Sequence, residues 1–112
     1  FTKGSSWITF RPQDLPTRPK SVQIEFKCRM GYVDLTFSST DFAVFKQKVD
    51  PLLEAGMSAH KTGKSAAVRI SVEAFRVSEP DEAALTKVRA GFDASKRLIN
   101  FYRRHRGILA VI

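Results

Sequence analysis

Strict two-residue alternation over residues 21–37 constrains the fold of this chain more than any other feature of its sequence. The apolar positions of its two halves are Val22, Ile24, Phe26 and Cys28, then Val33, Leu35 and Phe37. Successive side chains of a strand point to opposite faces, so the pattern predicts two strands that are each apolar on one face and polar on the other. Gly31 lies between the halves, which predicts an antiparallel hairpin.

The register of this hairpin follows from the rule that paired residues of neighbouring strands share a face. A two-residue turn at residues 30–31 sets each apolar residue opposite another apolar residue, and Gly31 supplies the positive φ that such a turn needs. In this register Lys27 faces Asp34. The polar residues predicted to share one open surface are Glu25, Lys27, Arg29, Tyr32, Asp34 and Thr36.

Patterns on either side of the hairpin predict one further strand before it, and a helix, a strand and a second helix after it. The first helix covers residues 42–53, where Pro51 is expected to kink or break it. A strand over residues 66–75 places Phe75 on its outer side, where the ring could stack on a base. The second helix carries an apolar stripe of Leu85, Val88, Phe92, Ser95, Ile99 and Tyr102. With a short strand at residues 7–10, the order β-β-β-α-β-α predicts a two-layer α+β domain whose antiparallel sheet packs on two helices.

Length and composition predict one domain over residues 1–112, because 43% hydrophobic residues can build a core without covalent support. Cys28 is the only cysteine, which excludes an internal disulfide and favours a reducing, cytoplasmic compartment. No apolar stretch approaches the roughly 20 residues that cross a bilayer, so no membrane partner is expected. No cofactor is expected either, except Mg²⁺ if the chain is a metal-dependent nuclease. The chain starts without Met and ends in apolar residues 107–112, which predicts a fragment or a terminal strand that must be covered.

Clustered positive charge points to a polyanionic partner. The net charge is +8, with six basic residues against two acids in residues 1–31 and five against none in residues 96–106. Clustered Lys and Arg displace counterions from phosphates, so we predict a non-catalytic module that contacts nucleic acid, with DNA, RNA and an acidic protein surface left open. The simpler alternative is a solvated surface that keeps a small domain soluble. The predicted contact residues are Arg11, Arg18, Lys20, Lys27, Arg29, Tyr32, Lys61, Lys64, Arg103, Arg104 and Arg106.

A second hypothesis is a metal-dependent nuclease that uses Glu25, Lys27 and Asp34. Two acids and a lysine on one strand face could hold Mg²⁺ and orient a water for phosphodiester cleavage. The simpler interpretation of the same residues is a surface ion pair between Lys27 and Asp34, worth about 0.2–1 kcal/mol. His60 and His105 have no carboxylate or thiol pattern around them in the sequence, so neither is expected to bind a metal.

Residues 58–65 approach the spacing of a phosphate-binding loop, with Ser58 where that motif has glycine. The predicted context differs as well, because a helix precedes this segment and a strand follows it. An NTPase is therefore not expected. Lys61 and Lys64 remain candidates for a simple phosphate contact.

Two segments, residues 31–37 and 60–70, resemble parts of the C-terminal region of bacterial proteins grouped with the PD-(D/E)XK nuclease superfamily. In that superfamily the catalytic aspartate precedes the Glu-x-Lys motif along the chain, whereas Asp34 follows Glu25 and Lys27 here. The resemblance, which covers roughly residues 20–75, therefore implies an accessory domain of a nuclease-like protein rather than the nuclease centre.

The apolar end of the chain supports a third, structural hypothesis. Residues 108–112 are expected to form an edge strand, and an exposed edge of that kind pairs readily with another strand. This interpretation predicts a homo-oligomer or docking of the rest of a longer protein.

Overall fold

A computed structural model describes residues 2–3, 8–12, 15–16, 21–76 and 82–110. The strands are β1 Thr2–Lys3, β2 Ile8–Phe10, β3 Val22–Lys27, β4 Tyr32–Phe37, β5 Met57–Thr62 and β6 Ser65–Ser71. The helices are α1 Phe42–Val49, the 3₁₀ turn η1 Asp50–Leu52, α2 Glu82–Arg104 and α3 Arg106–Leu109.

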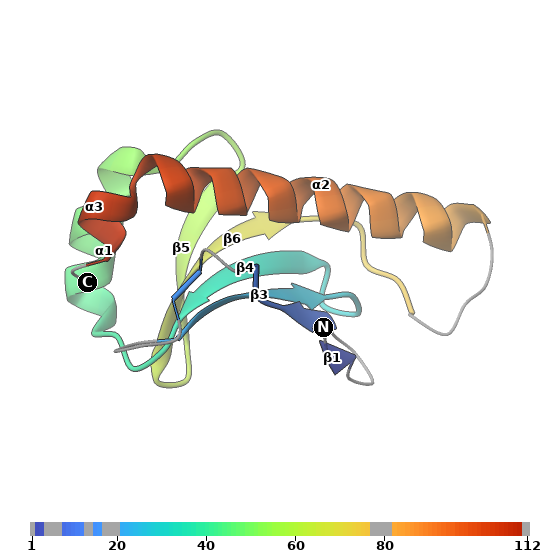
Figure 1. The fold of residues 1–112 in the computed structure, drawn as a ribbon. Helices are drawn as coiled ribbons and strands as arrows, with labels where there is room; N and C mark the ends of the chain where they lie inside the picture. Colours follow the sequence, from blue (N-terminus) through green and yellow to red (C-terminus); the bar gives the residue numbers. More distant parts are fainter. Residues whose placement is uncertain (1, 4–7, 13–14, 17–20, 77–81, 111–112) are drawn as a thin grey trace.

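The strands form one antiparallel sheet in the order β1-β2-β3-β4-β6-β5. Figure 1 shows the helices on one side of this sheet, with α2 running lengthwise over it and α1 and α3 gathered at one end. Helix α2 contacts β3 and β4, and α1 contacts β5 and β6. The predicted α+β class, an antiparallel sheet packed on helices, is confirmed.

The core lies between the sheet and the helices. Phe26 from β3, Phe45 from α1 and Phe101 from α2 are all fully buried, and full burial of such a side chain stabilises a fold by about 1.5–3 kcal/mol. The rings of Phe37 and Phe45 lie 5.3 Å apart and link β4 to α1. Cys28 is buried among these residues, as its place on the apolar strand face predicts.

The predicted register of the β3–β4 hairpin is wrong by two residues. Lys27 pairs with Tyr32, and Asp34 lies opposite Glu25 rather than Lys27. The turn therefore has four residues, 28–31, and the amide of Gly31 donates to the carbonyl of Lys27 at 2.9 Å. Gly31 does adopt a positive φ of 78°. Because the shift is even, the paired side chains of β3 and β4 stay on the faces predicted for them, whereas Arg29 lies in the turn.

Residues 58–65 do not form a phosphate-binding loop. They belong to the β5–β6 hairpin, in which Thr62 pairs with Ser65 around a two-residue turn at Gly63 and Lys64. The helix predicted directly before this segment is wrong, because β5 precedes the turn. The strand predicted after it is present as β6. Gly63 has a φ of 61°, which suits such a turn.

The strand predicted over residues 66–75 ends at Ser71, and Phe75 does not face outward. Its ring is buried, with 6% of its surface exposed, and meets Phe26 edge-on at 5.7 Å. The backbone turns inward here because the amide of Phe75 donates to the carbonyl of Cys28 at 2.9 Å. Phe75 is therefore a core residue and offers no stacking platform.

Helix α2 buries a face that is rotated from the predicted stripe. Leu85 and Phe92, two members of that stripe, are 54% and 41% exposed, whereas Ser95 and Tyr102 are buried. Among the described residues of α2, the buried ones are Ala84, Gly91, Ala94, Ser95, Leu98, Phe101 and Tyr102. Small residues dominate the first half of this face because the helix approaches β3 closely there: a Cβ at Gly91 would lie 2.0 Å from Cε2 of Phe26.

The ends of the shorter helices follow from local sequence. Asp41 caps α1 by accepting from the amide of Val44. The α-helix ends at Val49 and Pro51 lies in the 3₁₀ turn η1 that follows, which agrees with the predicted break near Pro51. The predicted C-terminal edge strand is wrong over residues 108–110, because Arg106–Leu109 form a helical turn that buries Leu109. Residues 111–112 lie outside the described part of the chain.

Candidate nucleic-acid interface

The polar face of the sheet is closed over by its own side chains. Asp34 is 1% exposed and accepts two hydrogen bonds from Arg69, at 2.8 Å from Nε and 3.1 Å from Nη2. The guanidinium carbon of Arg69 lies 3.6 Å from the centre of the Tyr32 ring. Tyr32 therefore stacks on an arginine of its own chain, which weakens its case as a platform for a base.

Three groups on this face have shifted pKa values. Burial raises the pKa of Asp34, although its hydrogen bond and ion pair with Arg69 oppose that rise. Burial lowers the pKa of Arg69, but the hydrogen bond and charge of Asp34 outweigh burial and raise it overall. Burial and the charge of Arg69 lower the pKa of His60, whose Nε2 lies 2.9 Å from the hydroxyl of Ser58.

The predicted trio of Glu25, Lys27 and Asp34 is divided between separate partners. Nζ of Lys27 lies 3.0 Å from the carboxylate of Glu25, while Asp34 is held by Arg69. Among the described residues, no group of three or more His, Cys, Asp or Glu side chains could hold a metal ion. The ion pair predicted between Lys27 and Asp34 is also wrong, because each residue has a different partner.

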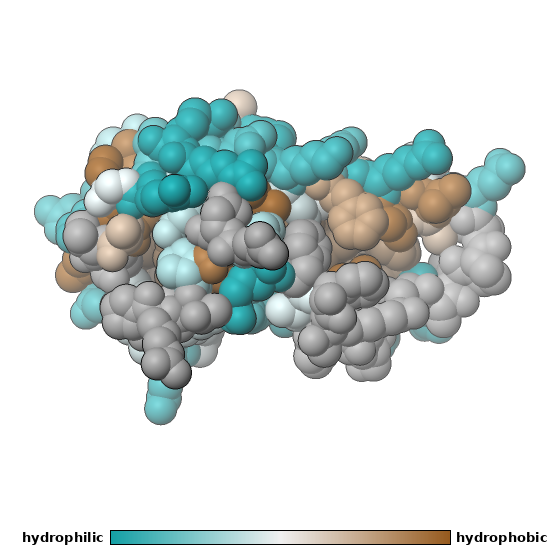
Figure 2. All heavy atoms as spheres, viewed as in Figure 1, coloured by the Kyte–Doolittle hydropathy of each residue, from teal (hydrophilic) through white to brown (hydrophobic). Residues whose placement is uncertain are grey.

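The outer face of α2 carries a row of exposed cations. Arg89, Lys96 and Arg103 recur at intervals of seven residues, which places them on one side of the helix about 10.5 Å apart, and all three are exposed. We call this set the α2 ridge. Figure 2 shows hydrophilic side chains along this edge of the molecule, above an apolar area under the N-terminal half of α2.

The α2 ridge was only partly foreseen. Arg103 belongs to the predicted tail cluster, but Arg89 and Lys96 were not among the predicted contact residues. The signal was present in the sequence as cations spaced at seven-residue intervals, a period that keeps side chains on one helix face.

The predicted tail arginines serve partly to hold the fold together. Arg104 forms an ion pair with Glu54, and Arg97 donates to the carbonyl of Ala55 at 2.7 Å, so both attach α2 to the segment before β5. The guanidinium of Arg106 lies 6.0 Å from the centre of the Tyr102 ring. These contacts leave Arg104 and Arg106 at the surface but orient them toward their own chain.

The other predicted contact residues are dispersed. Arg11 donates to the carbonyl of Val22 and to the side chain of Gln23 on β3. Lys61 and Lys64 are exposed beside the β5–β6 turn and line a pocket of about 500 Å³ with the start of α1. Arg29 is exposed in the β3–β4 turn. Arg18 and Lys20 lie outside the described residues.

Comparison with protein-family models, curated proteins and solved structures finds no significant match to this chain. The resemblance to the PD-(D/E)XK superfamily and the accessory role it implies therefore stay predictions. Within the described part of the chain, none of the helices has the length and apolar character to cross a bilayer.

Proposed function

We propose that this chain is a non-catalytic basic module that contacts nucleic acid through the α2 ridge. The observation that carries the proposal is the spacing of Arg89, Lys96 and Arg103 along one exposed side of a single helix. They extend over about 21 Å, which suits a partner with many phosphates in a row better than a small anion.

The charge balance of α2 supports the same partner. Its 23 residues include six cations and only two acids, Glu82 and Asp93. Within the described part of the chain, Arg89 and Lys96 form no ion pair or hydrogen bond, so no acidic side chain there has to be displaced before they contact a phosphate. A rigid helix also holds the cations at fixed intervals, which limits the conformational entropy lost on binding.

Salt-dependent binding of labelled duplex and single-stranded oligonucleotides tests this proposal. Fluorescence anisotropy should give an affinity that falls as salt rises, with the logarithm of the binding constant linear in the logarithm of the salt concentration. The double variant Arg89→Ala/Lys96→Ala should bind more weakly and reduce the slope by about 0.9 for each phosphate of duplex DNA that the variant no longer neutralises.

The control is Lys46→Ala/Lys48→Ala, which removes two exposed cations from α1, one of them paired with Asp50, and changes the net charge equally. This variant should retain most of the affinity and the slope. The proposal fails if oligonucleotides do not bind at low salt. It also fails if both double variants weaken binding equally, because net charge and not the α2 ridge would then be responsible.

A further inference from the structure

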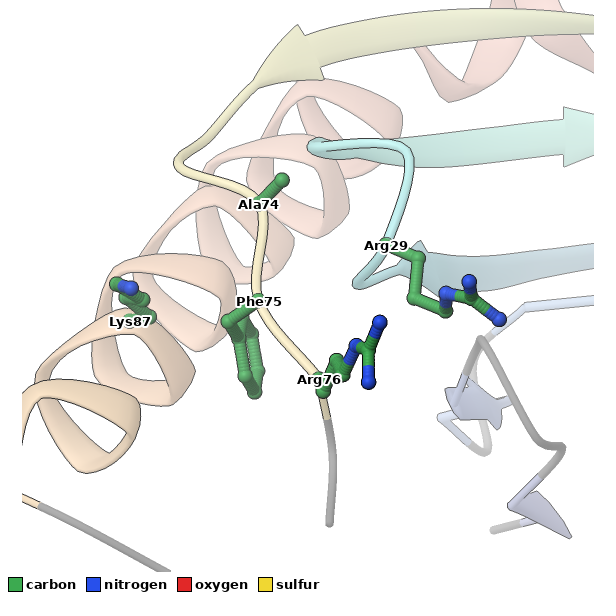
Figure 3. Close-up of a pocket in the computed structure, with 5 residues that line it drawn as sticks. All are labelled: Arg29, Ala74, Phe75, Arg76 and Lys87. Carbon is green, nitrogen blue, oxygen red and sulfur yellow. The ribbon is translucent and has the colours of Figure 1, made fainter. Parts of the chain in front are cut away.

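A pocket with two arginines at its mouth lies at the far end of the sheet from α1. Arg29 in the β3–β4 turn and Arg76 beyond β6 line a pocket of about 280 Å³, together with Ala74, Phe75 and Lys87. In Figure 3 the guanidinium group of Arg76 points from the segment after β6 toward the side of Arg29, whose side chain extends from the hairpin turn away from Phe75, and Lys87 lies on the opposite side of Phe75 from both. We call this feature the arginine pocket.

The backbone that carries the two arginines is held firmly. The amide of Val72 donates to the carbonyl of Gly31, and the amide of Phe75 donates to the carbonyl of Cys28, both at 2.9 Å. Phe75 is buried against Phe26 and anchors the segment just before Arg76. Although the arginine side chains are exposed, the chain positions from which they extend are therefore fixed relative to each other.

Among the described residues, no acid balances the two arginines of the arginine pocket. Within the described residues, Arg29 and Arg76 form no ion pair or hydrogen bond, and no carboxylate lines the pocket. Lys87 differs, because its ammonium lies 3.5 Å from the carboxylate of Glu73. Two cations that line one pocket repel each other, and a bound anion between them would convert that repulsion into attraction. The planar fork of a guanidinium suits a tetrahedral phosphate with several oxygens.

We propose that the arginine pocket binds a phosphomonoester, the terminal phosphate at the end of a nucleic-acid strand. A phosphomonoester carries about −1.5 to −2 charge at neutral pH, which two arginines can balance, and it leaves the pocket on one side only. An internal phosphodiester carries a single negative charge, which balances only one of the two arginines. This assignment rests on the proposed function only in taking the phosphate from a nucleic acid. Phosphate binding by the arginine pocket does not depend on that function.

Strand ends that differ only in their phosphate test the assignment. Oligonucleotides of one sequence with a 5′-phosphate, a 3′-phosphate or two hydroxyl ends are compared by anisotropy. A terminal phosphate should raise affinity about ten-fold, the equivalent of one charge-assisted hydrogen bond. In parallel, a nucleoside monophosphate should shift the amide NMR signals of residues 28–31 and 72–76, and the matching nucleoside should not.

The variant Arg29→Gln/Arg76→Gln should abolish the preference for a phosphorylated end, and its NMR spectrum reports whether it is folded. Arg89→Gln/Lys96→Gln removes two charges from the α2 ridge instead and should weaken all strands equally while keeping the preference. A preference that survives in Arg29→Gln/Arg76→Gln overturns the assignment, as does the absence of both the preference and the NMR shifts. NMR shifts at the pocket without any oligonucleotide binding support the pocket and refute the proposed function.

Discussion

Replacing Gly91 with alanine sets two physical effects of opposite sign against each other. Alanine is favoured over glycine in a helix by about 1 kcal/mol, so propensity alone predicts a more stable protein. However, the new Cβ would lie 2.0 Å from Cε2 and 2.1 Å from Cζ of Phe26, whose ring is fully buried. That ring also packs edge-on against Phe75 at 5.7 Å and Phe92 at 6.5 Å, so it cannot move without disturbing both ring pairs.

The steric effect should prevail. Overpacking a core costs about 1–3 kcal/mol, and an overlap of this depth belongs at the upper end. After the gain in helix propensity, we expect Gly91→Ala to lower the free energy of unfolding by about 2 kcal/mol and Tm by about 8 °C or more. Chemical denaturation followed by circular dichroism measures the first quantity and a thermal scan the second.

A double-mutant cycle with Phe26→Leu isolates the clash, because leucine lacks the ring atoms that a Cβ at position 91 would meet. In that background Gly91→Ala should be neutral or stabilising, which gives a coupling energy of about 1–3 kcal/mol. Gly107 in α3 provides the control, since a Cβ there would meet no atom within 4 Å and Gly107→Ala should not destabilise the protein. If Gly91→Ala alone raises stability, the close approach of α2 to β3 is refuted.

Three further predictions concern the polar face and the hairpin turn. Asp34→Ala should lower the free energy of unfolding by about 3 kcal/mol, because it leaves the guanidinium of Arg69 without its buried partner. Denaturant titrations measure this loss, and a loss under about 1 kcal/mol would contradict the prediction. Because the pKa of Asp34 is raised above its ordinary 3.8, its proton stabilises the fold at low pH, and that contribution is lost as pH rises through the raised value. The stability advantage of the wild type over Asp34→Asn should therefore shrink as pH rises above 3.8 and through the raised pKa, and an advantage that grows would show that Arg69 outweighs burial. Gly31→Ala should destabilise the protein by more than about 1 kcal/mol, because φ at this position is 78° and the new Cβ would lie 2.9 Å from the carbonyl oxygen of Val72. An unchanged thermal unfolding curve would refute this.

Local patterns predicted which elements exist better than they predicted how those elements pack. Helix α2 shows why: Leu85 and Phe92 have the spacing of a buried stripe, but the sheet admits only small residues close to the helix axis at Gly91. Which helix face is buried depends on the shape of the opposing surface, and hydrophobic spacing does not contain that information. The exposed pair Leu85 and Phe92 is the result.

The open polar face and its Lys27–Asp34 ion pair were predicted wrongly for a related reason. Asp34 was correctly placed on the polar side of β4, yet its partner Arg69 comes from β6, which is 35 residues further along the chain. On this side β4 pairs with β6 and not with β5, the next strand along the chain, and that choice is a property of the whole sheet. The β5–β6 hairpin was missed because β5 has few apolar residues and so lacks the alternation that identifies β3 and β4. The same absence of long-range information hid the arginine pocket, whose Arg29 and Arg76 lie 47 positions apart.

The four-residue turn between β3 and β4 determines which insertions and deletions this fold can tolerate. Side chains alternate with a period of two, so adding or removing a single residue here would send Phe26 or Leu35 into solvent, whereas a change of two would return each to the core. Even that change has a cost, because the carbonyls of Cys28 and Gly31 each accept a hydrogen bond from the segment beyond β6. Evolution should therefore alter the length of this turn in steps of two, and only together with residues 72–76.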